Sequence, residues 1–298
     1  AWVQAQGMGG LVPQAPIFID APRAIVNESL AAYAQGILHV TDRLHLTAGI
    51  RWTEDTKEHE VEQVFMNGDS EGSAGSEKFE EVTPLISVGY DFTDDIFGYF
   101  TWSEGFRDGG YPARFNGSSL PDPLPVFGPE FVTSYEVGLK TELLDNRLRL
   151  NLSGFLTDYQ DYQGAAEPTN LNPGALGVTV INIGDVEIRG FESEMTALLS
   201  DNLTINWALG YLDSDIKCIN SYNPDNTPLE CDPANVASSA GYDITTDSTI
   251  PRLPEWTSNL SANYSMPIDS MMEGAELTWR LNYIYRGEQQ SAITNSAN

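Results

Sequence analysis

Apolar and polar side chains alternate along most of this chain, and this alternation limits what the chain can fold into. In residues 44–53 the even-numbered positions are apolar and the odd-numbered ones are mostly polar or small. The same period recurs in residues 203–211 and 277–285. A period of two places successive side chains on opposite faces of a β-strand. The sequence therefore predicts an all-β protein.

About ten such runs can be counted, and most are longer than the nine to eleven residues that a tilted strand needs to cross a bilayer. The predicted strands are residues 27–40, 43–58, 79–92, 96–108, 132–143, 146–163, 179–199, 203–216, 253–267 and 275–288.

The connections between these runs alternate between short and long. Antiparallel, up-and-down strands with tight turns at one end and long loops at the other are typical of a transmembrane β-barrel of the outer membrane. The short connections fall at 41–42, 93–95, 145, 200–202 and around 269, and the long ones at 59–78, 109–131, 164–178 and 217–252.

Composition agrees with this fold and excludes other classes. The net charge is −28, whereas a nucleic-acid partner requires a basic surface. No apolar run approaches the 18 or so residues of a membrane-spanning helix. Aromatic residues near the predicted strand ends, such as Trp52, Tyr90, Trp102, Tyr211 and Trp256, suit the two aromatic girdles of a membrane barrel.

The segment from Glu54 to Glu81 is strongly acidic, with ten acidic and two basic side chains. We interpret it as a solvated surface. The alternative is that these loop carboxylates bind Ca²⁺, although no EF-hand spacing is present.

Cys218 and Cys231 lie close together in a stretch rich in Asn, Asp and Pro. We predict a disulfide formed in an oxidising compartment, which contributes roughly 3 kcal/mol in the loop-entropy model. A metal site is disfavoured because no second Cys or His pair is nearby.

We find no sequence feature of an enzyme. A nucleophile elbow, a His-Glu-x-x-His motif and a phosphate-binding Gly loop are all missing from the sequence. The three histidines, His39, His45 and His59, are scattered along the sequence, and we interpret them as wall or surface residues rather than metal ligands.

Six segments carry motifs that are specific in this order and spacing. They are VTDRLHLTAGIRW (40–52), YFTWSEGFRDGGY (99–111), TSYEVGLK (133–140), DYQDY (158–162), GFESE (190–194) and RLPEWT (252–257). Together they resemble the β-barrel of TonB-dependent outer-membrane receptors, over nearly the whole chain from about Ser29 onward.

The resemblance implies a barrel of 22 strands with a plug domain in its lumen. About ten strands, no plug and no C-terminal aromatic strand can be found here. We therefore expect residues 1–298 to be an internal part of one such barrel, with residues 1–26 as an extracellular loop. The expected partners are the remaining strands of the same receptor, outer-membrane lipid and lipopolysaccharide, and the TonB complex acting through the plug. No resident cofactor is expected.

The function implied by the resemblance is import of a scarce, bulky nutrient, most often a ferric siderophore, across the outer membrane of a Gram-negative bacterium. Our candidate substrate contacts are Arg107, Tyr111, Arg114 and Phe115, because arginines with aromatics can hold an anionic, ring-rich ligand. The alternative for Arg107 is an ion pair with a lumen carboxylate such as Glu136.

Three other interpretations stay open on the sequence alone. One is a passive porin, which shares the barrel but binds nothing tightly. Another is a small, closed ten-stranded barrel, such as an adhesin or an outer-membrane protease. The last is a secreted, soluble β-sandwich, although the outward apolar stripes argue against it.

Overall fold

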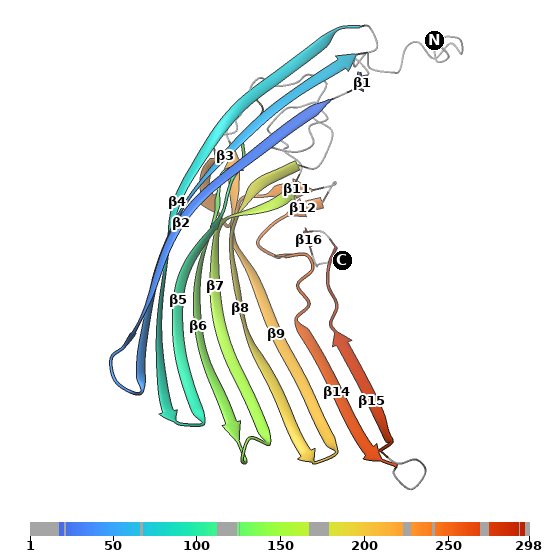
Figure 1. Cartoon of the computed structure of the whole chain (residues 1–298). Coiled ribbons are helices and arrows are strands. Elements are labelled where there is room, and N and C mark those ends of the chain that lie inside the picture. Colours follow the sequence, from blue (N-terminus) through green and yellow to red (C-terminus); the bar gives the residue numbers. More distant parts are fainter. Residues whose placement is uncertain are drawn as a thin grey trace, which may run out of the picture.

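Ten long strands form one antiparallel sheet in the computed structural model (Figure 1). The structure describes residues 18–20, 22–65, 68–111, 124, 126–166, 179–222, 228–239, 242–268, 274–291 and 293–295. The long strands are β2 (Arg23–His39), β3 (Leu44–Phe65), β4 (Ser70–Thr93), β5 (Ile96–Arg107), β6 (Glu130–Leu143), β7 (Leu148–Ala166), β8 (Thr179–Ser200), β9 (Leu203–Tyr222), β14 (Trp256–Pro267) and β15 (Glu276–Arg286). Each pairs with the next in this order. The ten predicted strands are therefore confirmed.

Short connections lie at one end of the sheet and longer ones at the other, and we call these the turn end and the loop end (Figure 1). Six short strands accompany the long ones: β1 (Phe18–Asp20), β10 (Pro228–Asp232), β11 (Ala237–Ser239), β12 (Tyr242–Ile244), β13 (Ser248–Thr249) and β16 (Thr294–Asn295). Four of them, β10 to β13, belong to the connection between β9 and β14. No helix among the described residues has the length and apolar character to cross a bilayer.

Three predicted loops are wrong in part, because strand pairing continues past the membrane-length segment. The loop expected at 217–252 begins with the last residues of β9 and contains β10, which pairs with β9. The loop expected at 59–78 is mostly a hairpin, in which β3 and β4 stay paired as far as Val64 and Ser70. The extracellular loop expected at 1–26 already contains the start of β2, where Arg23 pairs with Val61 of the extended β3. The backbone N–H and C=O groups on the edge of the long β3 need hydrogen-bond partners. Residues 23–26 provide them by extending β2.

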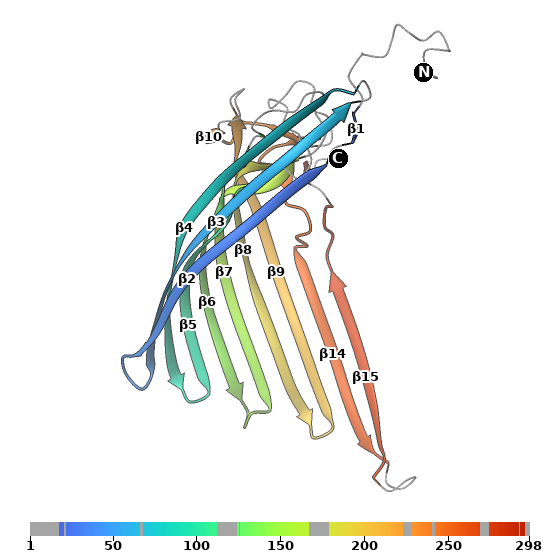
Figure 2. The ribbon, with the colours of Figure 1, turned by 45° about the horizontal axis from the view of Figure 1, so that its top comes forward.

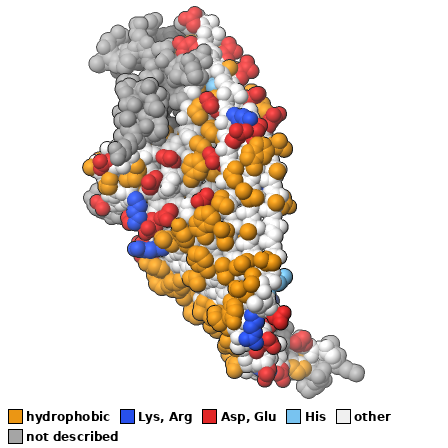
Figure 3. All heavy atoms as spheres, turned by 90° about the vertical axis from the view of Figure 1, so that its left-hand side faces the viewer, with side chains coloured by type: hydrophobic (Ala, Val, Ile, Leu, Met, Phe, Trp, Pro, Cys, Tyr) orange, Lys and Arg blue, Asp and Glu red, His pale blue; other side chains and the backbone are white. Residues whose placement is uncertain are grey.

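The outward face of the sheet carries an apolar band. Figure 3 shows hydrophobic side chains spread broadly over one side of the molecule, with acidic side chains toward the loop end and again near the turn end. Exposed residues of this band include Ile50, Ile86, Val137 and Leu152. Leu203 and Tyr211 lie eight residue steps apart on the apolar face of β9, which is about 27 Å along the strand and roughly 20 Å of height at the tilt of a barrel strand. Such a band matches the height of apolar surface that an outer-membrane barrel presents to lipid.

An aromatic cluster marks the upper limit of the band on β8, β9 and β14. The ring of Phe191 lies 5.7 Å from Tyr211 and 5.9 Å from Trp256, and the last two rings are 4.7 Å apart. Two residues further toward the loop end, Arg189 and Asp213 form an ion pair of 2.6 Å. Side chains on the same face thus change from aromatic to charged within two residues. Such a change is expected at the boundary between lipid and water.

The inward face is polar and is not packed on a second sheet of long strands within the described residues. Cross-strand hydrogen bonds join Ser87 to Thr101 at 2.8 Å and Thr196 to Asn206 at 3.0 Å. A soluble β-sandwich would place two apolar faces together, so that alternative is wrong. The single sheet curves without closing: among the described residues, β2 and β15 do not pair with each other (Figure 2). A closed ten-stranded barrel is therefore also contradicted.

The two faces should respond differently to charge. We expect Leu152→Arg, in the middle of the apolar face of β7, to lower the free energy of unfolding in lipid vesicles by about 2–4 kcal/mol, the cost of arginine on a barrel's lipid face at the midplane. The matched control is Ser153→Arg, one residue along and on the inward face, opposite Glu192. Denaturant unfolding measures both. Equal losses for the two variants would contradict the assignment of the faces.

Candidate functional site

The loop-end connections fold inward over the sheet and form what we call the rim. Two apolar clusters hold them there. The smaller cluster joins β3 to the β5–β6 connection, and the larger joins β8 and β9 to the β9–β14 connection and to Ile293. The smaller contains Val61, Tyr111 and Leu124, and the larger contains Ile181, Ile183, Val186, Ile216, Ile219, Ile244, Ile250 and Ile293. The rim is therefore a packed structure on the inner wall.

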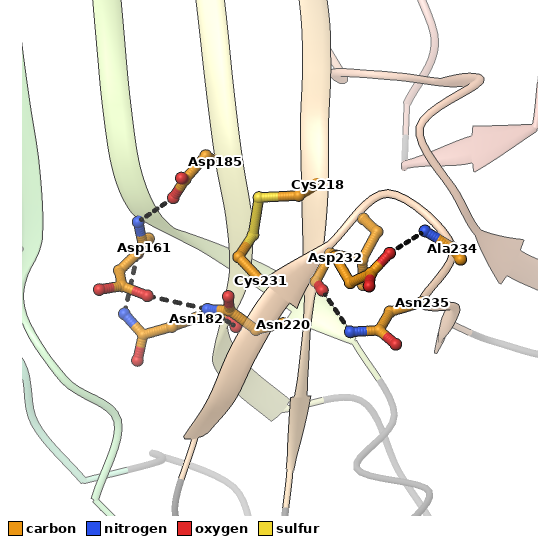
Figure 4. The surroundings of a disulfide bond; sticks show 10 residues. Asp161, Asn182, Asp185, Cys218, Asn220, Cys231, Asp232, Ala234 and Asn235 are labelled. Carbon is orange, nitrogen blue, oxygen red and sulfur yellow. Dashed lines mark hydrogen bonds between the residues drawn. A yellow bond between two sulfur atoms is a disulfide. The ribbon is translucent and has the colours of Figure 1, made fainter.

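Asn182 is the centre of a buried hydrogen-bond network at the base of the rim. Its Oδ1 accepts from the backbone N–H of Gly128 at 2.7 Å. Its Nδ2 donates to the carbonyls of Gly128 at 3.0 Å and Asp161 at 2.8 Å. Asn220 on β9 donates to the Asp161 carboxylate at 2.8 Å (Figure 4). The side chain of one residue on β8 thus ties the β5–β6 connection to β7.

A strand irregularity creates the space for this network. Asp161 has a left-handed φ of 55°, and the β7–β8 register shifts between Tyr159 and Tyr162. The backbone N–H of Asp161 donates to Asp185 Oδ1 at 3.1 Å instead of continuing the ladder. Gly184 faces it with φ 152°, and a Cβ there would lie 2.1 Å from the Cys218 carbonyl oxygen. Bulges of this kind redirect side chains near functional sites.

Gln163 and Glu130 extend the network toward β5 and β6. The Gln163 backbone N–H donates to Glu130 Oε2 at 2.5 Å, and its Nε2 donates to the Asp108 carbonyl at 2.8 Å. Burial raises the pKa of the Glu130 carboxyl, while the Gln163 hydrogen bond and the Arg107 charge lower it in part. Burial and the nearby Glu130 also raise the pKa values of Tyr159 and Tyr162. Both phenols therefore stay protonated and can donate hydrogen bonds.

The structure joins Cys218 of β9 to Cys231 of β10 in a disulfide with a Cα–Cα distance of 5.4 Å (Figure 4). This bond fastens the start of the long β9–β14 connection to the sheet. Asp185 lies close enough to the two sulfur atoms to suggest a cation cluster. Cysteines in a disulfide have no thiolate to offer a metal, so we assign no metal to this group.

Arg107 ends β5 with an exposed side chain and lies in register with Glu130 on β6. Its expected alternative partner, Glu136, is opposite Thr101, far down the wall, and accepts a hydrogen bond from Tyr99 at 2.6 Å. The pairing of Arg107 with Glu136 is therefore wrong, because the register places the two residues at different heights.

Tyr111 is buried, with 9% of its surface exposed, and its ring contacts that of His59 at a centroid distance of 3.9 Å and a tilt of 44°. Gly75 makes room for this pair, since a Cβ there would lie 2.8 Å from both side chains. An ion pair between Lys57 and Asp108 fastens the same connection to β3. The other two predicted contacts, Arg114 and Phe115, lie outside the described residues.

Sequence reasoning missed the buried polar residues of the rim: Glu130, Gln163, Asn182 and Asn220. The bulge at Asp161 and the partner at Gly128 are far apart in sequence, and only the fold brings them together.

Two sequence expectations concern ionisable groups elsewhere. The interpretation of the histidines as wall or surface residues agrees with the places of His39 and His45 on β2 and β3, but the two are not apart in the fold, because the β2–β3 turn places His39 directly opposite His45. Calcium binding by the acidic segment stays a prediction. Its residues Glu58, Glu60 and Glu62 occupy alternate, exposed positions of β3 on the outward face, and Glu54 pairs with Lys78 at 2.9 Å.

Comparison with known proteins identifies the family. The family model described as TonB dependent receptor-like, beta-barrel matches residues 3–298. The probable TonB-dependent siderophore receptor PiuA of Acinetobacter baumannii is 24% identical over 241 residues, which cover 76% of this chain and 30% of PiuA. The pesticin receptor of Yersinia pestis is 28% identical over 167 residues, covering 56% and 23% of the two chains.

Solved structures share the fold. The ferric yersiniabactin uptake receptor FyuA from Yersinia pestis superposes with a TM-score of 0.67 at 20% identity, over 93% of this chain and 37% of FyuA. The ferric-catecholate import receptor Fiu from Escherichia coli K12 gives a TM-score of 0.63 at 16% identity, over 92% of this chain and 36% of Fiu. The chain thus spans less than two fifths of the length of these proteins.

The match over almost all residues, together with the curved antiparallel sheet, decides the assignment. TonB-dependent receptors are transport receptors rather than enzymes, and they lie in the outer membrane of Gram-negative bacteria as β-barrels. This chain belongs to the TonB-dependent receptor family and forms part of its β-barrel domain.

Proposed function

We propose that this chain is part of the wall of a receptor that imports a ferric siderophore with energy from the TonB complex. The observation that carries the proposal is the rim: loop-end connections that are packed and hydrogen-bonded onto the inner wall, where a substrate entering from outside must pass. The relatives support the cargo, since the matched proteins include a probable siderophore receptor and a ferric-pyoverdine receptor.

Among the described residues, the outer edges of β2 and β15 have no partner strand, which supports further strands of the same receptor as the direct partners of this sheet. Backbone N–H and C=O groups left unpaired in lipid cost several kcal/mol each. The remaining strands would satisfy them and close the barrel. Outer-membrane lipid and lipopolysaccharide would then contact the apolar band and the charged residues above it. The TonB complex would act through a plug domain within the closed barrel.

Arg107 is the residue of the rim best suited to an anionic cargo. Its guanidinium is exposed on the inward side of the loop end, and Tyr159 and Tyr162 lie near Glu130, its register partner. The two tyrosine rings meet edge to face at 5.9 Å. A guanidinium beside protonated phenols offers charge, hydrogen-bond donors and aromatic surface to a ring-rich ferric complex. Arg114 and Phe115 remain proposed contacts on the connection that follows. Tyr111 is buried against His59, so we propose that it positions this connection rather than touching the cargo directly.

A passive porin would also place charged residues at the mouth of a barrel. It has no need of a mouth narrowed by loops that are fixed from two sides, as the Lys57–Asp108 pair and the Asn182 network fix the β5–β6 connection. We therefore favour a receptor that binds its cargo. The proposed step makes and breaks no covalent bond, so no catalytic group is assigned.

We expect Arg107→Ala to weaken binding of a ferric siderophore by about 10- to 100-fold, the range for loss of a hydrogen bond to a charged group. Quenching of tryptophan fluorescence in the detergent-purified receptor measures the affinity, with ferric catecholate and ferric hydroxamate complexes as probes. The matched control is Arg189→Ala, because Arg189 pairs with Asp213 on the outward face.

Unchanged affinity in Arg107→Ala would remove Arg107 from the contacts. Failure of both classes of ferric complex to bind the unaltered receptor would instead contradict the proposed cargo.

We also expect Asn182→Ala to release the β5–β6 connection. Removing the amide takes away the acceptor of the Gly128 N–H and the donor to the Asp161 carbonyl, at a cost of about 1–3 kcal/mol for a buried unsatisfied group. The Gly128 carbonyl keeps the bond that it accepts from Gln163 Nε2 at 3.0 Å. Hydrogen exchange at Gly128 should therefore speed up. Asn206→Ala, which alters a side chain lower on the wall, should leave Gly128 protected. Equal protection in both variants would show that the network does not hold the rim.

A further inference from the structure

Two of the three histidines of the chain meet at the turn end, away from the rim. His39 is the last residue of β2 and His45 is the second residue of β3, and the hairpin register pairs them directly. Their Nδ1 atoms are 2.7 Å apart, and the rings stand nearly perpendicular, with centroids 4.8 Å apart. Both belong to the odd-numbered positions that form the inward face.

Asp91 on β4 completes the arrangement from the other side of the His45 ring. Its Oδ2 lies 2.6 Å from His45 Nε2. A carboxylate can only accept at this distance, so Nε2 of His45 carries a hydrogen and donates it. In a neutral ring the lone pair is then on Nδ1, and it points at Nδ1 of His39. In this arrangement His39 Nδ1 carries a hydrogen and donates it to Nδ1 of His45, which joins the two rings.

This is the arrangement that imidazole ligands of a metal adopt. A carboxylate bound to the outer nitrogen of a histidine fixes the tautomer and raises the basicity of the nitrogen that faces the ion. Zinc binds imidazole nitrogen at about 2.0–2.1 Å with tetrahedral geometry, so two ligating nitrogens lie about 3.3 Å apart, roughly 0.6 Å more than the two Nδ1 atoms here. Replacing the shared proton by an ion requires a small opening of two side chains.

We propose that His39 Nδ1 and His45 Nδ1 bind a divalent transition-metal ion of the class that prefers imidazole, such as Cu²⁺ or Zn²⁺. Asp91 acts as the positioning residue that orients His45 and supplies negative charge. Water would occupy the remaining coordination positions, because His39 is exposed and the His45 side chain is 25% exposed. Arg43 belongs to the adjoining β2–β3 turn and is the nearby cation. Its guanidinium donates a hydrogen bond to the Phe92 carbonyl at 3.4 Å.

The proposed ion site is separate from the proposed cargo site. His39 and His45 flank the β2–β3 turn, whereas Arg107 and Asn182 lie at the opposite end of the sheet (Figure 1). The third histidine, His59, is buried at the loop end, hydrogen-bonded to Ser73 at 3.1 Å. It therefore provides a matched control for any effect of removing an imidazole.

The test uses the receptor purified in detergent with an affinity tag that contains no histidine, after treatment with a chelator. Cu²⁺ is added, and the electron paramagnetic resonance spectrum is recorded along with a Zn²⁺ titration by calorimetry. We expect coupling of the copper to two imidazole nitrogens. His39→Ala and His45→Ala should each remove one of them and weaken Zn²⁺ binding at least tenfold. Asp91→Ala should weaken it by about 10- to 100-fold, as for other outer-shell partners.

His59→Ala should leave both the spectrum and the Zn²⁺ affinity unchanged. Resistance of each variant to trypsin, compared with the unaltered receptor, shows that the barrel has folded. The same Zn²⁺ affinity in folded His39→Ala and His45→Ala would overturn the proposal, and so would a copper spectrum without nitrogen coupling that depends on these two residues.

Discussion

Backbone hydrogen bonding in the absence of water is the constraint on which this structure depends. Within a bilayer, every N–H and C=O must find a partner in the protein, and a sheet of long antiparallel strands meets that demand along its whole length. The register runs through the ten long strands with shifts confined mainly to strand ends and to the bulge near Asp161. Among the described residues, the backbone groups on the outer edges of β2 and β15 have no partner strand. We therefore propose that other strands of the same receptor pair there.

The alternation of side chains then divides the sheet between two environments. The outward face satisfies lipid with an apolar band that ends in aromatic and then charged residues, as at Tyr211 and Asp213. The inward face is polar, as the interior of a barrel requires. At the loop end, connections pack on this face through two apolar clusters. Polar groups buried at the rim bond to one another, and Asn182 joins the β5–β6 connection to β7 in this way.

Much of the fold could be predicted because alternation is a local signal that survives in a single sequence. It fails where the contrast between the faces is lost. Beyond Thr53, β3 places Glu58 and Glu60 outward and the polar His59 and Gln63 inward, so a paired hairpin looks like an acidic loop. The contact between His39 and His45 needed only the short turn between them and could have been derived from it. The register of Arg107 with Glu130 could not, because a long connection separates the two residues.

The central claim is that this chain is part of a receptor that transports its cargo with energy from the TonB complex. The most direct measurement is uptake of radiolabelled iron, supplied as a ferric siderophore, by cells that express the receptor with and without a functional TonB protein. We expect uptake above background only when both the receptor and TonB are present. Uptake through the receptor at the same rate without TonB would contradict it and would indicate passive passage through the barrel.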